Sequence, residues 1–214
     1  MAELNESFTS PAPTRPIFQS IFGADWARLP TVMKRHYAIR PASDDSITVE
    51  GQLDIEMITP VSLMARLPGL LVPYQGQAVP VTVTFSSVRD RTGFRFERVF
   101  DYPDKPPIRF RSVMEPVGGN ELIEFMRFGL GWKAAYHWDG SKVILRHRGY
   151  VLRLFGRILP LPLEPILGRG HAEETPLSDD SFSMWTHTIH PLFGKTFGYR
   201  GRFRIAAMSC PEPS

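Results

Sequence analysis

The sequence predicts a mainly β protein in which one curved antiparallel sheet forms a barrel or half-barrel of about nine strands. From residue 47 onward, apolar and polar residues alternate with a period of two, as in strands with one buried face. The alternating segments follow one another after short links, without the interleaved helices that parallel strands require. A long twisted antiparallel sheet tends to curl and close on itself.

The chain has 214 residues, of which 43% are hydrophobic and 22% are charged, as in an ordinary folded domain. All-β domains often reach this length, so we expect a single domain over residues 17–207. Residues 1–16 are polar and rich in proline, and we expect a disordered lead-in there. Residues 208–214 are expected to form a tail.

Two short amphipathic helices are predicted before the first strand. Apolar residues from Phe18 to Leu29 recur at helical spacing, and the resulting stripe includes Phe22 and Trp26. A proline then interrupts the pattern, and a second helical face continues to Tyr37. We expect these helices to cap the mouth of the barrel or to pack on its open face.

The rest of the chain divides into strands and turns. Hairpin turns are predicted at residues 118–120 and at Asp139-Gly140, and a short helix is predicted within residues 59–67. The segment from Val143 to Leu159 stays open, because its residues from Val151 onward fit a helical face as well as a strand. The predicted strands are Ile47–Met57, Val79–Phe85, Phe94–Phe100, Ile108–Met114, Leu122–Phe128, Trp132–Trp138, Val143–Leu154, Ser181–Ile189 and Phe197–Ala206.

Three polar residues, Arg98, Ser112 and Glu124, interrupt the apolar faces of three successive strands. Counting from the turns places Arg98 opposite Phe110, and Ser112 opposite Glu124. Strands lie about 4.8 Å apart, so an extended Arg98 reaches Glu124 two strands away. An unpaired charge on a buried face is costly, and we therefore expect these residues to pair or to bind something. A structural ion pair and a polar anchor in a ligand pocket both remain open.

Two further polar residues share apolar strand faces. His147 lies on the face of Val143 and Leu145, and Tyr199 lies on the face of Phe197 and Phe203. Each side chain either points into the same possible ligand pocket as Arg98 and Glu124 or lies in the core with its polar atom hydrogen-bonded.

Several function classes lack support in the sequence. It contains no glycine-rich phosphate loop, zinc-ligand spacing or nucleophile elbow, and its single cysteine, Cys210, excludes an internal disulfide. His187 and His190 fall on opposite faces of a strand, so we predict that they do not share a metal. We also expect no cofactor. The net charge of +3 is too small to indicate a nucleic-acid partner. Without a signal sequence or a long uncharged apolar stretch, the protein is expected to be cytoplasmic.

Seven arginines fall on the outward faces of their strands. A solvated outer face explains them, and contact with an acidic partner or an anionic membrane surface is the alternative. These residues are Arg109, Arg111, Arg146, Arg148, Arg200, Arg202 and Arg204.

Several short pieces of the chain form a further pattern. They are the Phe-rich helix ending at Leu29-Pro30, the stretch Phe94–Ser112, Glu124–Gly129, Leu161–Leu163, His190–Gly194 and Tyr199–Gly201. Through these pieces the chain from Phe18 to Ile205 resembles domain of unknown function 4166, a bacterial family. The resemblance implies no established reaction. Family members occur alone or attached to reductase-like or small membrane modules, which implies an accessory or ligand-binding role and a reductase-like partner.

Three functions are compatible with these observations. The first is a module that binds an apolar or amphipathic small molecule, or a lipid, on the concave face through Arg98, Ser112, Glu124, His147 and Tyr199. The second is an enzyme that uses Glu124, His147 and Tyr199 as acid–base groups. The third is an interaction module that docks through the outer arginine face. We favour the first, because small barrels enclose ligand-sized interiors and no nucleophile–base set is evident from the spacing.

Overall fold

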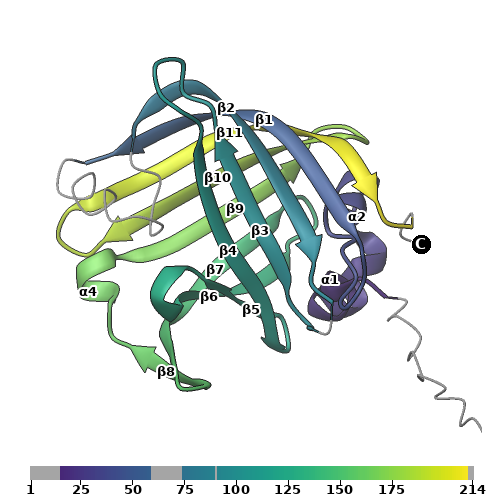
Figure 1. Cartoon of the computed structure of the whole chain (residues 1–214), viewed down its shortest axis with the longest axis horizontal. Coiled ribbons are helices and arrows are strands. Elements are labelled where there is room, and N and C mark those ends of the chain that lie inside the picture. The colour runs from purple at the N-terminus through teal and green to yellow at the C-terminus, as the bar shows by residue number, and fades with distance from the viewer. Residues whose placement is uncertain (1–14, 59–73, 90, 212–214) are drawn as a thin grey trace, which may run out of the picture.

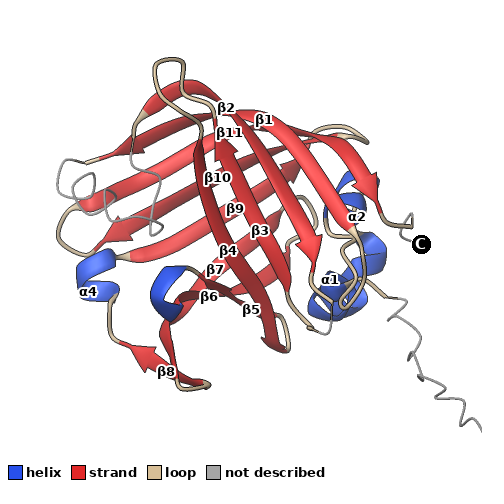
Figure 2. Cartoon of the chain, in the orientation of Figure 1, coloured by secondary structure: helices blue, strands red, loops and turns tan. Residues whose placement is uncertain are grey.

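A computed structural model describes residues 15–58, 74–89 and 91–211, and its architecture confirms the predicted β fold (Figures 1 and 2). The predicted helix within residues 59–67 and most of the predicted lead-in lie outside these residues. Eleven strands form one antiparallel sheet, and all but β8 belong to a closed barrel. The strands are β1 (Ser46–Met57), β2 (Gly76–Ser87), β3 (Phe94–Phe100), β4 (Ile108–Gly118), β5 (Glu121–Phe125), β6 (Leu130–Trp138), β7 (Val143–Leu154), β8 (Arg157–Leu161), β9 (Arg169–Pro176), β10 (Ser181–His190) and β11 (Gly194–Ser209).

The barrel is a meander in which successive strands pair, except that β9 pairs with β7 and not with β8, and the last strand returns to the first. β1 pairs with β11 along its whole length, from Ser46 opposite Ser209 to Met57 opposite Phe197. β7 pairs with β6 on one side, and on its other side with β9 up to Arg146 and with β8 from Tyr150 onward. The segment that the sequence left open is therefore a strand followed by a hairpin, and its helical alternative is wrong.

Two inward-facing glycines let β1 and β11 approach closely at this closure. A Cβ atom on Gly201 would lie 1.9 Å from the carbonyl oxygen of Gln52, and one on Gly51 would lie 2.1 Å from that of Arg202. Leu53 and Phe203 pack into the space that the missing side chains leave. The closure therefore requires residues without a Cβ at both positions.

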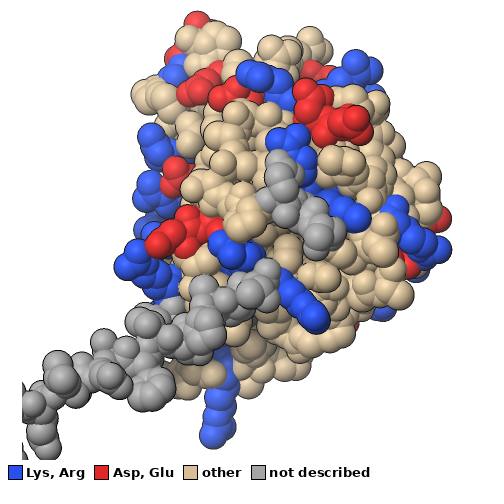
Figure 3. Space-filling view, turned by 90° about the vertical axis from the view of Figure 1, so that its right-hand side faces the viewer, with Lys and Arg blue, Asp and Glu red and all other residues tan. Residues whose placement is uncertain are grey.

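Short helices close one end of the barrel. They are α1 (Ile17–Phe22), the 3-10 helix η1 (Gly23–Arg28) and α2 (Thr31–His36). Phe18 is buried, and its ring centroid lies 4.4 Å from Tyr37 and 5.4 Å from Tyr136 of β6. Phe22 and Trp26 are also buried, as the sequence predicted. Figure 3 shows this side of the molecule, where basic and acidic side chains are interspersed.

A buried carboxylate ties the helices to the barrel wall. Glu174 of β9 points inward, accepts a hydrogen bond from the Tyr37 hydroxyl and lies 3.6 Å from Nε2 of His36. Burial, reinforced by the Glu174 charge, holds the pKa of Tyr37 well above its usual value, so the phenol keeps its proton at neutral pH.

The structure corrects several predicted boundaries. The first helix breaks at Gly23, whose φ is 54°, and continues as η1. β5 ends at Phe125, and the 3-10 helix η2 (Arg127–Gly129) follows where strand was predicted. The turn after β6 spans four residues, because Asp139 accepts three hydrogen bonds from the residues that follow it. Within the described residues, no helix is long and apolar enough to span a membrane.

The closure of the barrel makes a strong prediction for Gly201. Replacing it with alanine forces the β1 and β11 backbones apart, and we expect a loss of at least about 2 kcal/mol of unfolding free energy. Urea denaturation measures this loss, with Ser183→Ala on the outer face of β10 as the control, expected to change stability by less than about 0.5 kcal/mol. A Gly201→Ala variant as stable as the parent would contradict the steric account.

Candidate functional site

A cavity of about 360 Å³ opens at the end of the barrel opposite α1 and α2. Its walls are largely aromatic and include Phe100, Phe110, Trp132 and Phe197. Lining residues at the mouth include Ile166 of α4 (Glu164–Leu167), Phe193 of the β10–β11 turn, and Met126 and Leu130 on either side of η2. Figure 1 shows α4 at the end of the barrel opposite α1 and α2. This volume lies within the range of small-molecule pockets, which are typically about 300–1,000 Å³ and mostly apolar.

The floor of this cavity is polar. Arg98 of β3 donates hydrogen bonds to Glu124 of β5 and, at 2.9 Å, to Oγ of Ser112 on β4. Ser112 also donates to the same carboxylate oxygen at 2.7 Å. The three residues that share one predicted level therefore lie together, with the Arg98 and Glu124 side chains 12% and 11% exposed. Arg98 and Glu124 line the cavity, and Ser112 supports the pair from the wall.

Aromatic rings fix the position of the Arg98 guanidinium. Its central carbon lies 3.9 Å from the ring centroid of Phe96 and 4.3 Å from that of Phe110. Phe110 is the cross-strand partner of Arg98, as the sequence predicted. Stacking on ring faces stabilises a desolvated cation. Nε of Arg98 is buried and has no hydrogen-bond partner among the described residues.

Two more polar side chains face the same space. Tyr199 of β11 and Thr186 of β10 line the cavity side by side, and Oγ1 of Thr186 is buried with no hydrogen-bond partner in the described part of the chain other than the Tyr199 hydroxyl. Burial raises the pKa of the Tyr199 phenol, against the opposing effect of the nearby Arg98 charge. Tyr199 is therefore a neutral hydroxyl at physiological pH.

The polar floor separates this cavity from a smaller one. A space of about 70 Å³ lies between the floor and the helical cap, and Phe18, Tyr37 and Glu174 line it. The residues common to both cavities form the partition: Arg98, Phe100, Glu124, Trp132, Thr186 and Tyr199. A molecule entering from the open end therefore meets polar atoms at the bottom of an apolar chamber.

His147 of β7 lies behind the wall of the large cavity rather than among its lining residues. Its Nδ1 accepts a hydrogen bond from Nε1 of Trp132 at 2.9 Å, and its Nε2 lies 3.5 Å from a Glu164 oxygen. Burial lowers the pKa of His147, although Glu164 opposes this shift. The imidazole supports Trp132, which does line the cavity.

The hairpin between β4 and β5 has a different register from the one predicted. Glu124 lies opposite Met114 instead of Ser112, because the ladder shifts between Pro116 and Gly118. The Ser112–Glu124 contact survives because side chains on one face also reach diagonal neighbours. Parity along the strands therefore predicted that these three side chains lie together, although the predicted residue pairing was wrong.

Sequence reasoning missed several cavity residues on β10, including Thr186, Thr188 and His190. The sequence pattern does indicate them, because Phe182, Met184 and Thr186 occupy every second position of the strand and therefore share one face. His190 and His187 do lie on different faces, and Nε2 of His190 donates a hydrogen bond to the Pro165 carbonyl oxygen at 2.7 Å. The described residues contain no group of three or more histidine, cysteine or acidic side chains placed to hold a metal.

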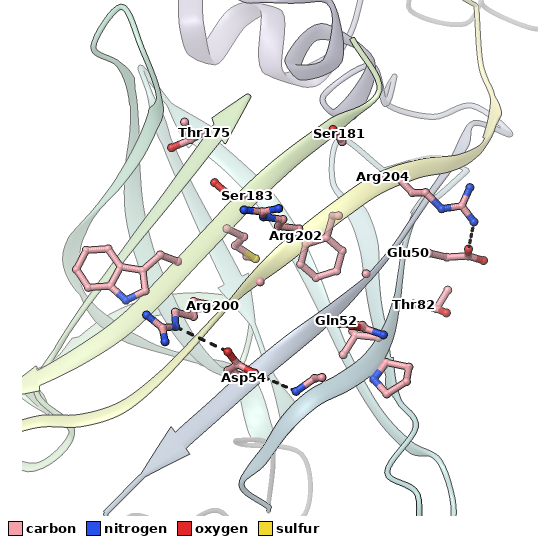
Figure 4. Close-up of a pocket in the computed structure, with 18 of the residues that line it drawn as sticks. Glu50, Gln52, Asp54, Thr82, Thr175, Ser181, Ser183, Arg200, Arg202 and Arg204 are labelled. Carbon is pink, nitrogen blue, oxygen red and sulfur yellow. Dashed lines mark hydrogen bonds and ion pairs between the residues drawn. The ribbon is translucent and has the colours of Figure 1, made fainter. Parts of the chain in front are cut away.

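The outer arginine face is interleaved with acidic residues where β11 meets β1 (Figure 4). Arg204 lies 3.0 Å from Glu50, and Arg200 lies 3.9 Å from Asp54. On β4, Arg109 and Arg111 both pair with Glu97. These side chains are largely exposed, so the pairs are weak, but they reduce the net charge of the surface.

Comparison with known proteins identifies the family. The family model described as a domain of unknown function (DUF4166) matches residues 29–203. The chain belongs to the DUF4166 family. The matched region begins just after η1 and ends within β11, so it includes β1 to β10, the first part of β11 and the complete polar floor. A comparison with curated proteins returned no significant match.

The Arg98–Glu124 pair gives this DUF4166 domain a testable stability signature. Arg98→Ala leaves the buried Glu124 carboxylate without its cation, and we expect a loss of about 3–5 kcal/mol of unfolding free energy. The double variant Arg98→Met/Glu124→Leu removes both charges and should recover most of this loss. Urea denaturation of the three proteins measures the effect, and equal losses in the single and double variants would contradict it.

The lowered pKa of His147 makes folding sensitive to acid. In the unfolded state His147 takes up a proton near pH 6.5, whereas in the folded state it does so only at lower pH. The unfolding free energy therefore decreases as the pH falls below about 6.5. When the pH is lowered from about 7.5 to about 5.5, we expect the unfolding free energy of His147→Gln to fall less than that of the parent. Urea denaturation of both proteins at the two pH values measures this difference. His187, whose pKa burial also lowers, is present in both proteins and cancels in the comparison.

Proposed function

We propose that this DUF4166 domain binds an amphipathic small molecule inside its barrel, with an apolar body between the aromatic walls and an uncharged polar group on the floor. One observation carries the proposal: the large cavity ends at two buried polar atoms, Nε of Arg98 and Oγ1 of Thr186, which have no described hydrogen-bond partner apart from the Tyr199 hydroxyl beside these side chains. Buried polar atoms normally have hydrogen-bond partners. A ligand oxygen at this position would supply one to both.

The charge balance of the floor supports an uncharged polar group. Glu124 already neutralises Arg98 in a site shielded from water. A carboxylate or phosphate on the ligand would add a second anion there without a second cation, and burying an unpaired charge is costly. The oxygen of a hydroxyl, carbonyl or amide would instead accept hydrogen bonds from Arg98 and from the Thr186 and Tyr199 hydroxyls.

The acid–base alternative finds less support in the geometry. Glu124 is held by Arg98 and Ser112, and His147 is held between Trp132 and Glu164 behind the cavity wall. A general base needs to reach the proton that it removes. Binding requires only the apolar chamber and its polar floor, so it is the function we propose.

Binding is measured by the fluorescence of N-phenyl-1-naphthylamine, a neutral apolar probe, added to the full chain. Dodecanol and sodium dodecanoate are then compared as competitors. We expect dodecanol to displace the probe at lower concentration, because the floor offers hydrogen bonds but no free cation. Thr186→Val removes one hydroxyl without changing the cavity shape, and it should weaken the competition by dodecanol about fivefold.

Thr82→Val is the matched control, because Thr82 lies on the outer surface of the barrel (Figure 4). It should leave probe binding and competition unchanged. Failure of the probe to bind the parent protein would overturn the proposal. Unchanged competition in Thr186→Val, or better competition by dodecanoate, would overturn the assigned polar floor.

A further inference from the structure

The end of the barrel that opens into the cavity carries most of the exposed apolar side chains. We call residues 126–130, 154–169 and 189–195 the apolar rim; they comprise η2, the β7–β8 hairpin with α4, and the β10–β11 turn. Of the thirteen exposed large hydrophobic side chains in the described part of the chain, nine belong to this rim. They are Phe128, Leu154, Phe155, Ile158, Leu159, Ile166, Ile189, Leu192 and Phe193.

These segments surround one opening. Nε2 of His190 lies 2.7 Å from the carbonyl oxygen of Pro165, which joins the β10–β11 turn to α4. η2 packs on the end of β7, where a Cβ on Gly129 would lie 2.6 Å from the Arg153 carbonyl oxygen. Ile166 and Phe193 belong both to the rim and to the lining of the cavity mouth. The rim is therefore continuous with the cavity entrance.

Two rim phenylalanines occupy positions that folding does not favour. Phe155 is 96% exposed with φ at 49°, and Phe128 is 77% exposed with φ at 60°. Bulky side chains in this left-handed region are strained, and asparagine or glycine would fit better. A phenylalanine that is both strained and exposed contributes little to the stability of the free protein. Its apolar surface is available for another contact.

Cationic side chains accompany these apolar residues. Arg127, Arg157 and Arg169 are exposed within the rim. The same residue ranges contain a single carboxylate, Glu164, which lies 3.5 Å from His147. Stacking two copies of this face would bring like charges together, whereas an anionic surface complements them.

From this combination we infer that the apolar rim docks on a lipid bilayer that contains anionic headgroups. Phe128 and Phe155 enter the interfacial region, and the neighbouring arginines contact the headgroups. Docking in this orientation sets the mouth of the cavity against the membrane. The inference concerns a surface distinct from the outer arginine face, and it stands whether or not the cavity binds a ligand.

The test is co-sedimentation of the full chain with phosphatidylcholine vesicles, prepared with and without phosphatidylglycerol. We expect binding to the anionic vesicles that weakens as salt is added. Phe128→Asn/Phe155→Asn should reduce binding at least about tenfold, because it removes two large apolar side chains. Asparagine tolerates a positive φ, so this variant should unfold at the same urea concentration as the parent or a higher one. Arg127→Gln/Arg157→Gln should weaken binding to anionic vesicles by about fivefold for each arginine.

The control variant is Val117→Ser/Leu177→Ser, which removes two exposed apolar residues away from the rim. It should bind vesicles as the parent does. Equal vesicle binding by the parent and the asparagine variant would overturn the inference, as would the absence of binding to anionic vesicles. It would also be overturned if the asparagine substitutions abolished self-association in sedimentation velocity and left vesicle binding unchanged.

Probe binding in vesicle-free buffer separates this inference from the proposed function. The asparagine variant should bind N-phenyl-1-naphthylamine normally, and Thr186→Val should bind vesicles normally. If the parent protein binds vesicles but not the probe, only the ligand proposal is rejected. If it binds the probe but not vesicles, only the docking surface is rejected.

Discussion

The pairing of β1 with β11 is the constraint on which the rest of the structure depends. It joins the first and last strands of a meander, so the barrel has no free edge at this position. As a result, one face of each strand points into the barrel and the other points outward. Once the wall is closed, α1 and α2 fill one end with aromatic side chains, and the remaining space opens at the other end. The position of the cavity thus follows from the closure of the barrel and from the helices before β1, which fill its other end.

Closure also explains why polar residues inside the barrel lie in layers. Arg98, Ser112 and Glu124 satisfy one another across three strands, and Glu174 binds Tyr37 near the helical cap. Between these two layers lies only a small space. Each layer fixes the position of neighbouring strands or helices, and the layer nearer the opening also presents atoms to whatever enters. A structural ion pair and a ligand anchor are therefore compatible roles for the same residues.

The sequence predicted the fold and the centre of the site because strand parity is a local property. Alternation alone placed Arg98, Glu124 and Tyr199 inside, and the structure has all three at the cavity. It missed β9, whose inward residues Gly170, Ala172 and Glu174 lack a large apolar side chain. Alternation also could not show that His147 lies behind Trp132. The bulge at Arg148 and the end of the β7–β9 pairing at Arg146 decide this, and both depend on tertiary packing.

The divided pairing of β7 has a consequence for how local stability is distributed. Beyond Arg146, β7 turns from β9 to β8, so the wall lacks a backbone ladder where Gly170 faces Trp132. Side chains hold the two strands together there, including the Tyr150 hydroxyl bonded to the Gly168 carbonyl at 3.0 Å. Fluctuations that separate the end of β7, with β8 still paired to it, from β9 break few backbone hydrogen bonds and leave the β1–β11 ladder intact. We therefore expect amide protons next to this gap to exchange with solvent through local opening, and those of the β1–β11 ladder to exchange only when the whole barrel unfolds.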